Sequence, residues 1–209
     1  MTAPSTARAE MLGRIRRALG QSRSVEVERH YHRTGALVAG SGEVLDLLAE
    51  RLEDYRATVV RTDASAVPRV VADLLDVPSV AVPDGVPAPW LAELTAEVRR
   101  DEPALTHAEL DDTAAVLTTC RVAIAETGTV VLDGGPGQGR RALTLLPDRH
   151  VVVVEADQVV HSVPDAIARL DVTRPLTWIS GPSATSDVEL VRVEGVHGPR
   201  DLRVVLVDG

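Results

Sequence analysis

Four short polar segments in the second half of the chain carry residue types that could do chemistry. Each follows or precedes a predicted strand, and open α/β sheets bind ligands where strands end. In the first segment, Glu126 is followed by Thr127 and Gly128, between two apolar runs. A carboxylate at a strand end can act as a general acid or base, and it can equally accept hydrogen bonds from the amides of a turn. The sequence leaves both roles open for Glu126.

The second segment is rich in glycine and ends in two arginines. Four glycines between positions 134 and 139 lead into Arg140 and Arg141. Exposed backbone amides beside guanidinium groups could hold a phosphate or a carboxylate. The segment matches neither the Walker pattern nor the dinucleotide fingerprint, so an ordinary surface loop is an equal alternative.

The third and fourth segments combine hydroxyls, a carboxylate and a histidine. Residues 181–189 contain Gly181, Ser183, Thr185 and Asp187, a set that suits a bound anion or, alternatively, a capped turn without a ligand. Residues 195–200 place His197 between glycines, shortly before Arg200. Such a histidine could exchange protons with a substrate or could merely lock its loop by a hydrogen bond.

The elements that position these segments alternate between helices and strands. This alternation, with strands that are continuously apolar, predicts an α/β fold whose largely parallel sheet is covered by helices on both faces. The predicted helices cover residues 41–56, 68–75, 87–98 and 164–170, and the predicted strands cover 57–61, 79–82, 114–118, 122–125, 129–132, 150–155, 176–179 and 202–207.

The N-terminal 35 residues differ from the rest in charge. They hold seven Arg and three Glu, a net charge of +4. Because the whole chain has a net charge of −9, residues 36–209 carry −13. We expect a helix ending near Leu19 and then a linker, giving an arm over residues 1–35 and one α/β domain over 36–209. The helix is amphipathic and could meet its own domain, a partner or a membrane surface. The acidic body argues against nucleic acid as a partner.

Composition excludes several classes of chemistry. All 22 basic residues are Arg, which removes lysine Schiff bases and the P-loop lysine. The single cysteine, Cys120, cannot hold an iron–sulfur cluster or close an internal disulfide, and its apolar context predicts a buried residue. No paired-histidine spacing supports a metal site, so we expect none. No apolar run reaches the length of a membrane span, and we expect a cytoplasmic protein.

These segments, in this order, resemble the lactate-utilization protein C family, which carries the LUD domain. The resemblance rests on residues 125–129, the segment 145–150 that leads into an apolar strand, residues 181–189 and residues 195–200. It covers residues 110–209 closely and residues 36–110 only in pattern.

The resemblance implies a fold like that of the NagB/RpiA/CoA-transferase group. It also implies a cytoplasmic role in oxidising L-lactate to pyruvate beside two iron–sulfur partner proteins. The clusters would belong to those partners, and we expect no cofactor on this chain. Analogy with the fold group leaves other possibilities: a regulatory module that binds a small anion or nucleotide, a CoA-transferase using Glu126, a sugar-phosphate isomerase, or a cyclo-ligase.

Taken together, the segments predict a pocket for a small carboxylate or phosphorylated ligand. Arg140 or Arg200 would pair with the carboxylate of the substrate, while His197 and Glu126 would move the proton of its hydroxyl group. The remaining pocket residues are Thr127, Gly128, Gly181, Ser183, Thr185 and Asp187.

Overall fold

The computed structural model describes residues 7–20, 26–28, 30–185, 193–194 and 198–208. The chain forms two compact units, Met1–Tyr31 and His32–Gly209. The first contains helix α1 (Ala7–Leu19), in which no residue is buried. None of the helices in the described ranges has the length and apolar character needed to cross a membrane.

The second unit is built on a six-stranded parallel sheet, as the alternation of helices and strands predicts. Its strand order is β1-β12-β7-β4-β2-β3, and every neighbouring pair runs parallel. The strands are β1 (Thr58–Thr62), β2 (Ser79–Val82), β3 (Glu97–Arg100), β4 (Ala115–Thr119), β7 (Arg149–Glu155) and β12 (Asp201–Val207).

A second, four-stranded sheet packs near the first. It has the order β8-β5-β6-β9, and a separate pair joins β10 to β11. These strands are β5 (Val122–Ile124), β6 (Thr129–Leu132), β8 (Val159–Val160), β9 (Thr177–Ile179), β10 (Ala184–Thr185) and β11 (Val193–Glu194).

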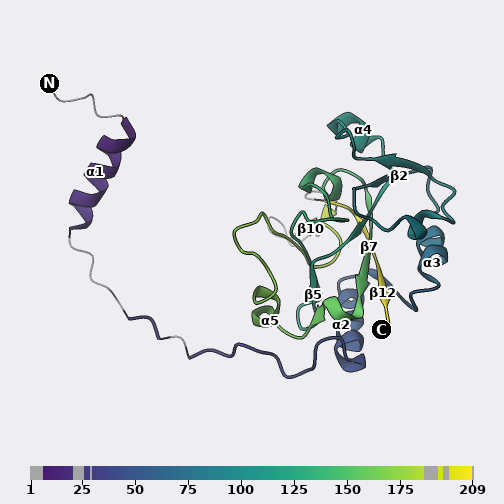
Figure 1. Ribbon diagram of the computed structural model, residues 1–209, viewed down its shortest axis with the longest axis horizontal. Coiled ribbons are helices and arrows are strands. Elements are labelled where there is room, and N and C mark those ends of the chain that lie inside the picture. The colour runs from purple at the N-terminus through teal and green to yellow at the C-terminus, as the bar shows by residue number, and fades with distance from the viewer. Residues whose placement is uncertain (1–6, 21–25, 29, 186–192, 195–197, 209) are drawn as a thin grey trace. The chain divides into compact units, whose positions relative to one another are not determined.

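Helices lie on both faces of the parallel sheet: α2 packs in the core cluster of one face and α3 in that of the other, and Figure 1 shows α3 beside β12. The α-helices of this unit are α2 (Gly42–Asp54), α3 (Val67–Leu74), α4 (His107–Asp111) and α5 (Val163–Ile167), and the short 3-10 helices are η1 (Ala88–Leu91), η2 (Arg141–Thr144) and η3 (Ala156–Gln158).

The continuously apolar strand β7 is buried on both faces. Val151 and Val153 pack in the cluster that contains α3, whereas Val152 and Val154 pack in the cluster that contains α2 and the second sheet. Because successive side chains of a strand point to opposite faces, a strand covered on both sides needs apolar residues at every position. The interior of β7 is therefore explained by its place in the middle of the sheet.

Residues 87–98 do not form the predicted helix. The chain there makes the single 3-10 turn η1 and later enters the edge strand β3. Proline at positions 87 and 89 removes two backbone donors, which limits regular helix in this stretch. The prediction of a helix over this range was wrong.

Candidate functional site

A cavity of about 210 Å³ opens between one face of the parallel sheet, η2 and the loop that follows β9. We refer to it as the His150 cavity. Its wall combines guanidinium, imidazole and hydroxyl groups with apolar side chains. The described residues that line it are Arg141, Thr144, His150, Trp178, Ile179, Ser180, Gly181, Pro182, Ser183, Gly198, Pro199 and Leu202.

His150 is the most deeply buried polar side chain of this wall. It is 1% exposed, and its Nε2 lies 2.8 Å from Oγ1 of Thr118, which is itself fully buried on β4. Burial, assisted by the positive charge of Arg141, lowers the pKa of His150 to about 3. The imidazole is therefore neutral at physiological pH, and it can offer one N–H donor and one acceptor.

Arg141 brings a positive charge to the cavity. Its Nη1 donates to the carbonyl oxygen of Thr144 at 2.9 Å and to the Thr144 hydroxyl at 3.0 Å. Burial lowers the pKa of Arg141, yet a guanidinium stays protonated near neutral pH. The described wall of the cavity thus combines the permanent positive charge of Arg141 with a neutral histidine.

Two loops complete the wall, and one of them contains predicted site residues. The backbone N–H of Ser183 donates to the carbonyl of Pro199 at 2.8 Å, which ties residues 181–183 to residues 198–199. Gly181 has φ of 81°, and a Cβ there would stand 2.5 Å from Cβ of Tyr55. Only glycine fits that position without displacing the neighbouring chain.

Of the sequence-predicted residues, Gly181 and Ser183 line the His150 cavity. Thr185 lies in β10, and its side chain is not among those described. Asp187 and His197 lie outside the described residues. The predicted roles of these last three residues stay predictions.

Glu126 does not line the cavity. It is exposed in the hairpin turn between β5 and β6, where the N–H of Gly128 donates to the carbonyl of Ala125 at 3.2 Å. Its own backbone N–H donates to the carbonyl of His161 at 3.0 Å. Gly128 has φ of 57°, and a Cβ there would lie 2.9 Å from Cβ of Arg51 on α2. The turn thus has a clear structural role.

Thr127 is linked to the cavity indirectly. Its hydroxyl lies 2.7 Å from that of Thr129, which lies 2.8 Å from the hydroxyl of Ser180 in the cavity wall. This row of three hydroxyls connects the hairpin to the site. It could fix the orientation of Ser180 toward a ligand.

The two arginines predicted to pair with a substrate carboxylate each bind an aspartate of the protein. Arg140 donates from Nε and Nη2 to the two carboxylate oxygens of Asp101, both at 2.9 Å. Arg200 makes the same fork-shaped contact with Asp148, at 2.7 and 2.8 Å. Arg140 lines a second, wider hollow of about 540 Å³, which shares Arg141 and Thr144 with the His150 cavity.

The glycine-rich segment is a packed loop rather than an open row of amides. The N–H groups of Gly135, Gly137 and Gln138 donate to Oδ1 of Asp133 and to the carbonyls of Asp84 and Gly135, respectively. Three amides that could have held a phosphate are thereby used within the protein. The loop instead secures the carboxyl ends of β2 and β4.

Replacing Gly137 with Ala should lower the free energy of unfolding by about 2 kcal/mol, against about 1 kcal/mol for Gly134→Ala. Both glycines have positive φ, 74° and 68°. A Cβ at Gly137 would meet the Thr119 hydroxyl at 2.6 Å, whereas one at Gly134 has its nearest contact at 3.6 Å. Urea denaturation of the two variants measures the difference, and equal losses would contradict the packing seen around Gly137.

The cavity also departs from the expected position in the sheet. His150 and Leu202, which pair in register, lie at the amino ends of β7 and β12. We expected ligand-binding residues at the carboxyl ends of strands. In this cavity only Ser180 and the loop after β9 lie at such an end. Residues 198–199 reach the site from the opposite direction, as the chain enters β12.

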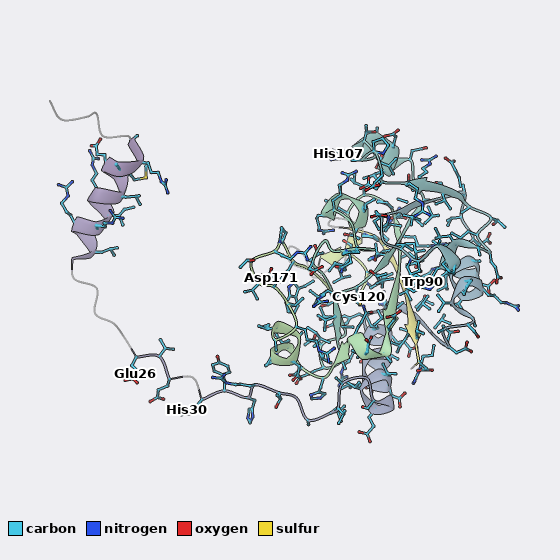
Figure 2. All side chains as sticks on the ribbon, in the orientation of Figure 1. Glu26, His30, Trp90, His107, Cys120 and Asp171 are labelled. Atoms are coloured by element: carbon cyan, nitrogen blue, oxygen red, sulfur yellow. The ribbon has the colours of Figure 1, made fainter. Side chains whose placement is uncertain are left out.

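Nothing in the described ranges forms a group of three or more His, Cys, Asp or Glu that could hold a metal ion. Cys120 is 3% exposed inside the α/β unit (Figure 2), and its Sγ donates to Oε1 of Gln158 at 3.4 Å. Burial raises the pKa of this thiol. A protonated thiol in this place is a poor metal ligand or nucleophile.

Comparison with known families decides the relationship of this chain. The family model of the LUD domain matches residues 34–207. The chain belongs to the LUD domain family. The match spans both sheets and all the described residues of the His150 cavity.

Relatives of this LUD chain include proteins with curated names and one solved structure. Lactate utilization protein C of Deinococcus radiodurans is 49% identical over 99% of both chains. Lactate utilization protein C of Bacillus subtilis is 33% identical over 44% of this chain and 41% of that protein. The crystal structure of a DUF162 family protein from Deinococcus radiodurans superposes with a TM-score of 0.66 at 44% identity, covering 79% of this chain and 96% of the other.

Sequence reasoning missed two polar residues of the site and did not single out a third. Thr118 and His150 received no binding role, although His150 opens a run of four valines, and Arg141 was considered only beside Arg140, in a cradle of backbone amides. A polar residue in a strand that is otherwise wholly apolar is a signal of a buried, partnered group. That signal could have pointed to His150.

Proposed function

We propose that this LUD domain protein acts in lactate utilization, as the subunit without an iron–sulfur cluster in a cytoplasmic system that oxidises L-lactate to pyruvate. The observation that carries the proposal is the 49% identity, over 99% of both chains, with a protein named lactate utilization protein C. The His150 cavity adds support, because a small site with one cation suits a short carboxylic acid.

Oxidation of L-lactate to pyruvate releases two electrons and two protons, so the system needs an electron acceptor. This chain does not have the cysteines to accept the electrons on an iron–sulfur cluster of its own, since its one cysteine, Cys120, is buried. We therefore assign the clusters to partner proteins, which would take the electrons. The part proposed for this chain is to hold the carboxylic acid.

Deleting the coding gene should abolish growth of the host on L-lactate and leave growth on glucose unchanged, in a strain without other lactate dehydrogenases. Reintroducing the wild-type gene should restore growth. A complementary measurement is lactate-dependent dye reduction in cell extracts, which should fall at least tenfold. Normal growth and normal dye reduction after deletion would contradict the proposed function.

A further inference from the structure

His150 presents a buried hydrogen-bonding atom without a partner. In the described part of the chain, its Nδ1 is the one buried side-chain nitrogen or oxygen that makes no hydrogen bond. Native proteins rarely leave such atoms unpaired, because desolvation of a polar group costs free energy that only a hydrogen bond recovers. Because His150 lines the cavity, its unpaired atom indicates a molecule that the cavity takes up.

The neighbouring threonine determines which proton that atom carries. The Thr118 hydroxyl is fully buried, and it forms a hydrogen bond with Nε2 of His150. If Nε2 carried the proton, the Thr118 hydrogen and the Nδ1 lone pair would both lack partners. If Thr118 donates to Nε2 instead, only an N–H at Nδ1 is left to satisfy. The second arrangement is favoured, so Nδ1 of His150 is a donor that needs an acceptor.

The rest of the cavity indicates the kind of acceptor. Arg141 supplies a positive charge in the same wall, and Ser180 and Ser183 supply hydroxyls. Apolar surface comes from Ile179 and Leu202. The matching ligand has negatively charged oxygens at one end and a short apolar group at the other. A volume of about 210 Å³ suits a ligand of only a few heavy atoms better than a nucleotide or coenzyme A.

We propose that the His150 cavity binds a short 2-oxo or 2-hydroxy carboxylate, with its carboxylate against Arg141 and its carbon-2 oxygen accepting a hydrogen bond from Nδ1 of His150. The inference rests on the proposed function, since pyruvate and L-lactate are the 2-oxo and 2-hydroxy acids that it involves. It assigns the position of the acid in this chain. Arg141 and His150 serve as binding residues, with Thr118 as a positioning residue.

Calorimetric titration of the purified full-length protein with pyruvate, L-lactate and acetate tests the assignment. Pyruvate and L-lactate should bind, and acetate should bind at least tenfold more weakly because it lacks the carbon-2 oxygen. Arg141→Gln should weaken pyruvate binding at least tenfold. The matched control is Arg69→Gln, at an exposed arginine of α3 on the other face of the sheet, which should leave binding unchanged.

Nitrogen-15 NMR of the histidine side chains gives an independent readout on the wild-type protein. The His150 signal, identified by its loss in His150→Gln, should show a proton on Nδ1, and pyruvate should shift that signal. Thr118→Val should release the ring from this tautomer and weaken binding at least tenfold, while the fold, checked by the remaining amide signals, is retained. This change in tautomer is a readout that a merely structural threonine would not produce.

Two results would overturn the assignment. One is the absence of pyruvate and L-lactate binding at 10 mM, which would leave water as the occupant. The other is binding that neither shifts the His150 signal nor responds to Arg141→Gln, which would place the acid elsewhere. These results can be told apart from failure of the proposed function. If the acid binds but gene deletion causes no growth defect on L-lactate, the binding site is supported and the role in lactate utilization is contradicted.

Discussion

Lowering the pH from 8 to 5 should destabilise the wild-type protein by about 2 kcal/mol more than it destabilises His150→Gln. The reason is that the pKa of His150 is about 3 in the folded protein, whereas an unfolded histidine titrates near its ordinary value of 6.5. Between these two values the unfolded state binds a proton that the folded state cannot accept. The contribution of His150 to stability is therefore complete above pH 6.5 and is lost as the pH falls toward 3.

Urea denaturation at pH 8, 6.5 and 5 measures this difference. Gln at position 150 does not titrate, so only the slope with pH is compared, and any constant loss of packing in the variant cancels. His107→Gln is the matched control, since His107 is exposed at the start of α4 (Figure 2). Its pH profile should follow the wild type. Parallel profiles for wild type and His150→Gln would show that His150 is not buried as described.

The parallel sheet could be predicted from sequence because its central strands are buried on both faces. Residues 150–155 and 202–207 are almost wholly apolar, a pattern that differs from the alternation of half-exposed strands. The edge strand β3 gave no such signal: its sequence Glu-Val-Arg-Arg is mostly exposed, because only one neighbour, β2, pairs with it. Because the exposed strand β3 lacks an apolar pattern, its first residues were included in the wrongly predicted helix over residues 87–98.

The site was only partly predictable, for a different reason. Gly181 and Ser183 could be recognised because their loop interrupts the apolar pattern directly after a strand. The sequence could not tell which of the adjacent residues Arg140 and Arg141 faces a ligand, because that depends on what each guanidinium meets after folding. The guanidinium of Arg140 meets the carboxylate of Asp101, 39 positions earlier in the chain, whereas Arg141 lines the His150 cavity.

Replacing Arg140 with Gln should lower the free energy of unfolding by about 3 kcal/mol. The side chain of Asp101 is 9% exposed, and burial raises its pKa, while hydrogen bonds from Arg140 and the N–H of Leu105 outweigh that effect and hold the pKa below its ordinary value. Without Arg140 the buried carboxylate loses its counter-charge and two donors. Thermal or urea unfolding at pH 7 measures the loss.

Arg200→Gln is the matched control, because it breaks a fork of the same geometry with Asp148 on the surface. The side chains of Arg200 and Asp148 are 59% and 56% exposed, so the loss in the free energy of unfolding should stay below about 1 kcal/mol. Adding Asp101→Asn to Arg140→Gln should recover part of the stability, since it removes the unpaired charge. If Arg140 instead binds the substrate carboxylate, Arg140→Gln would be as stable as the wild type and would bind pyruvate more weakly. The ratio of stability loss to affinity loss therefore separates an arginine that holds the fold from one that holds a ligand.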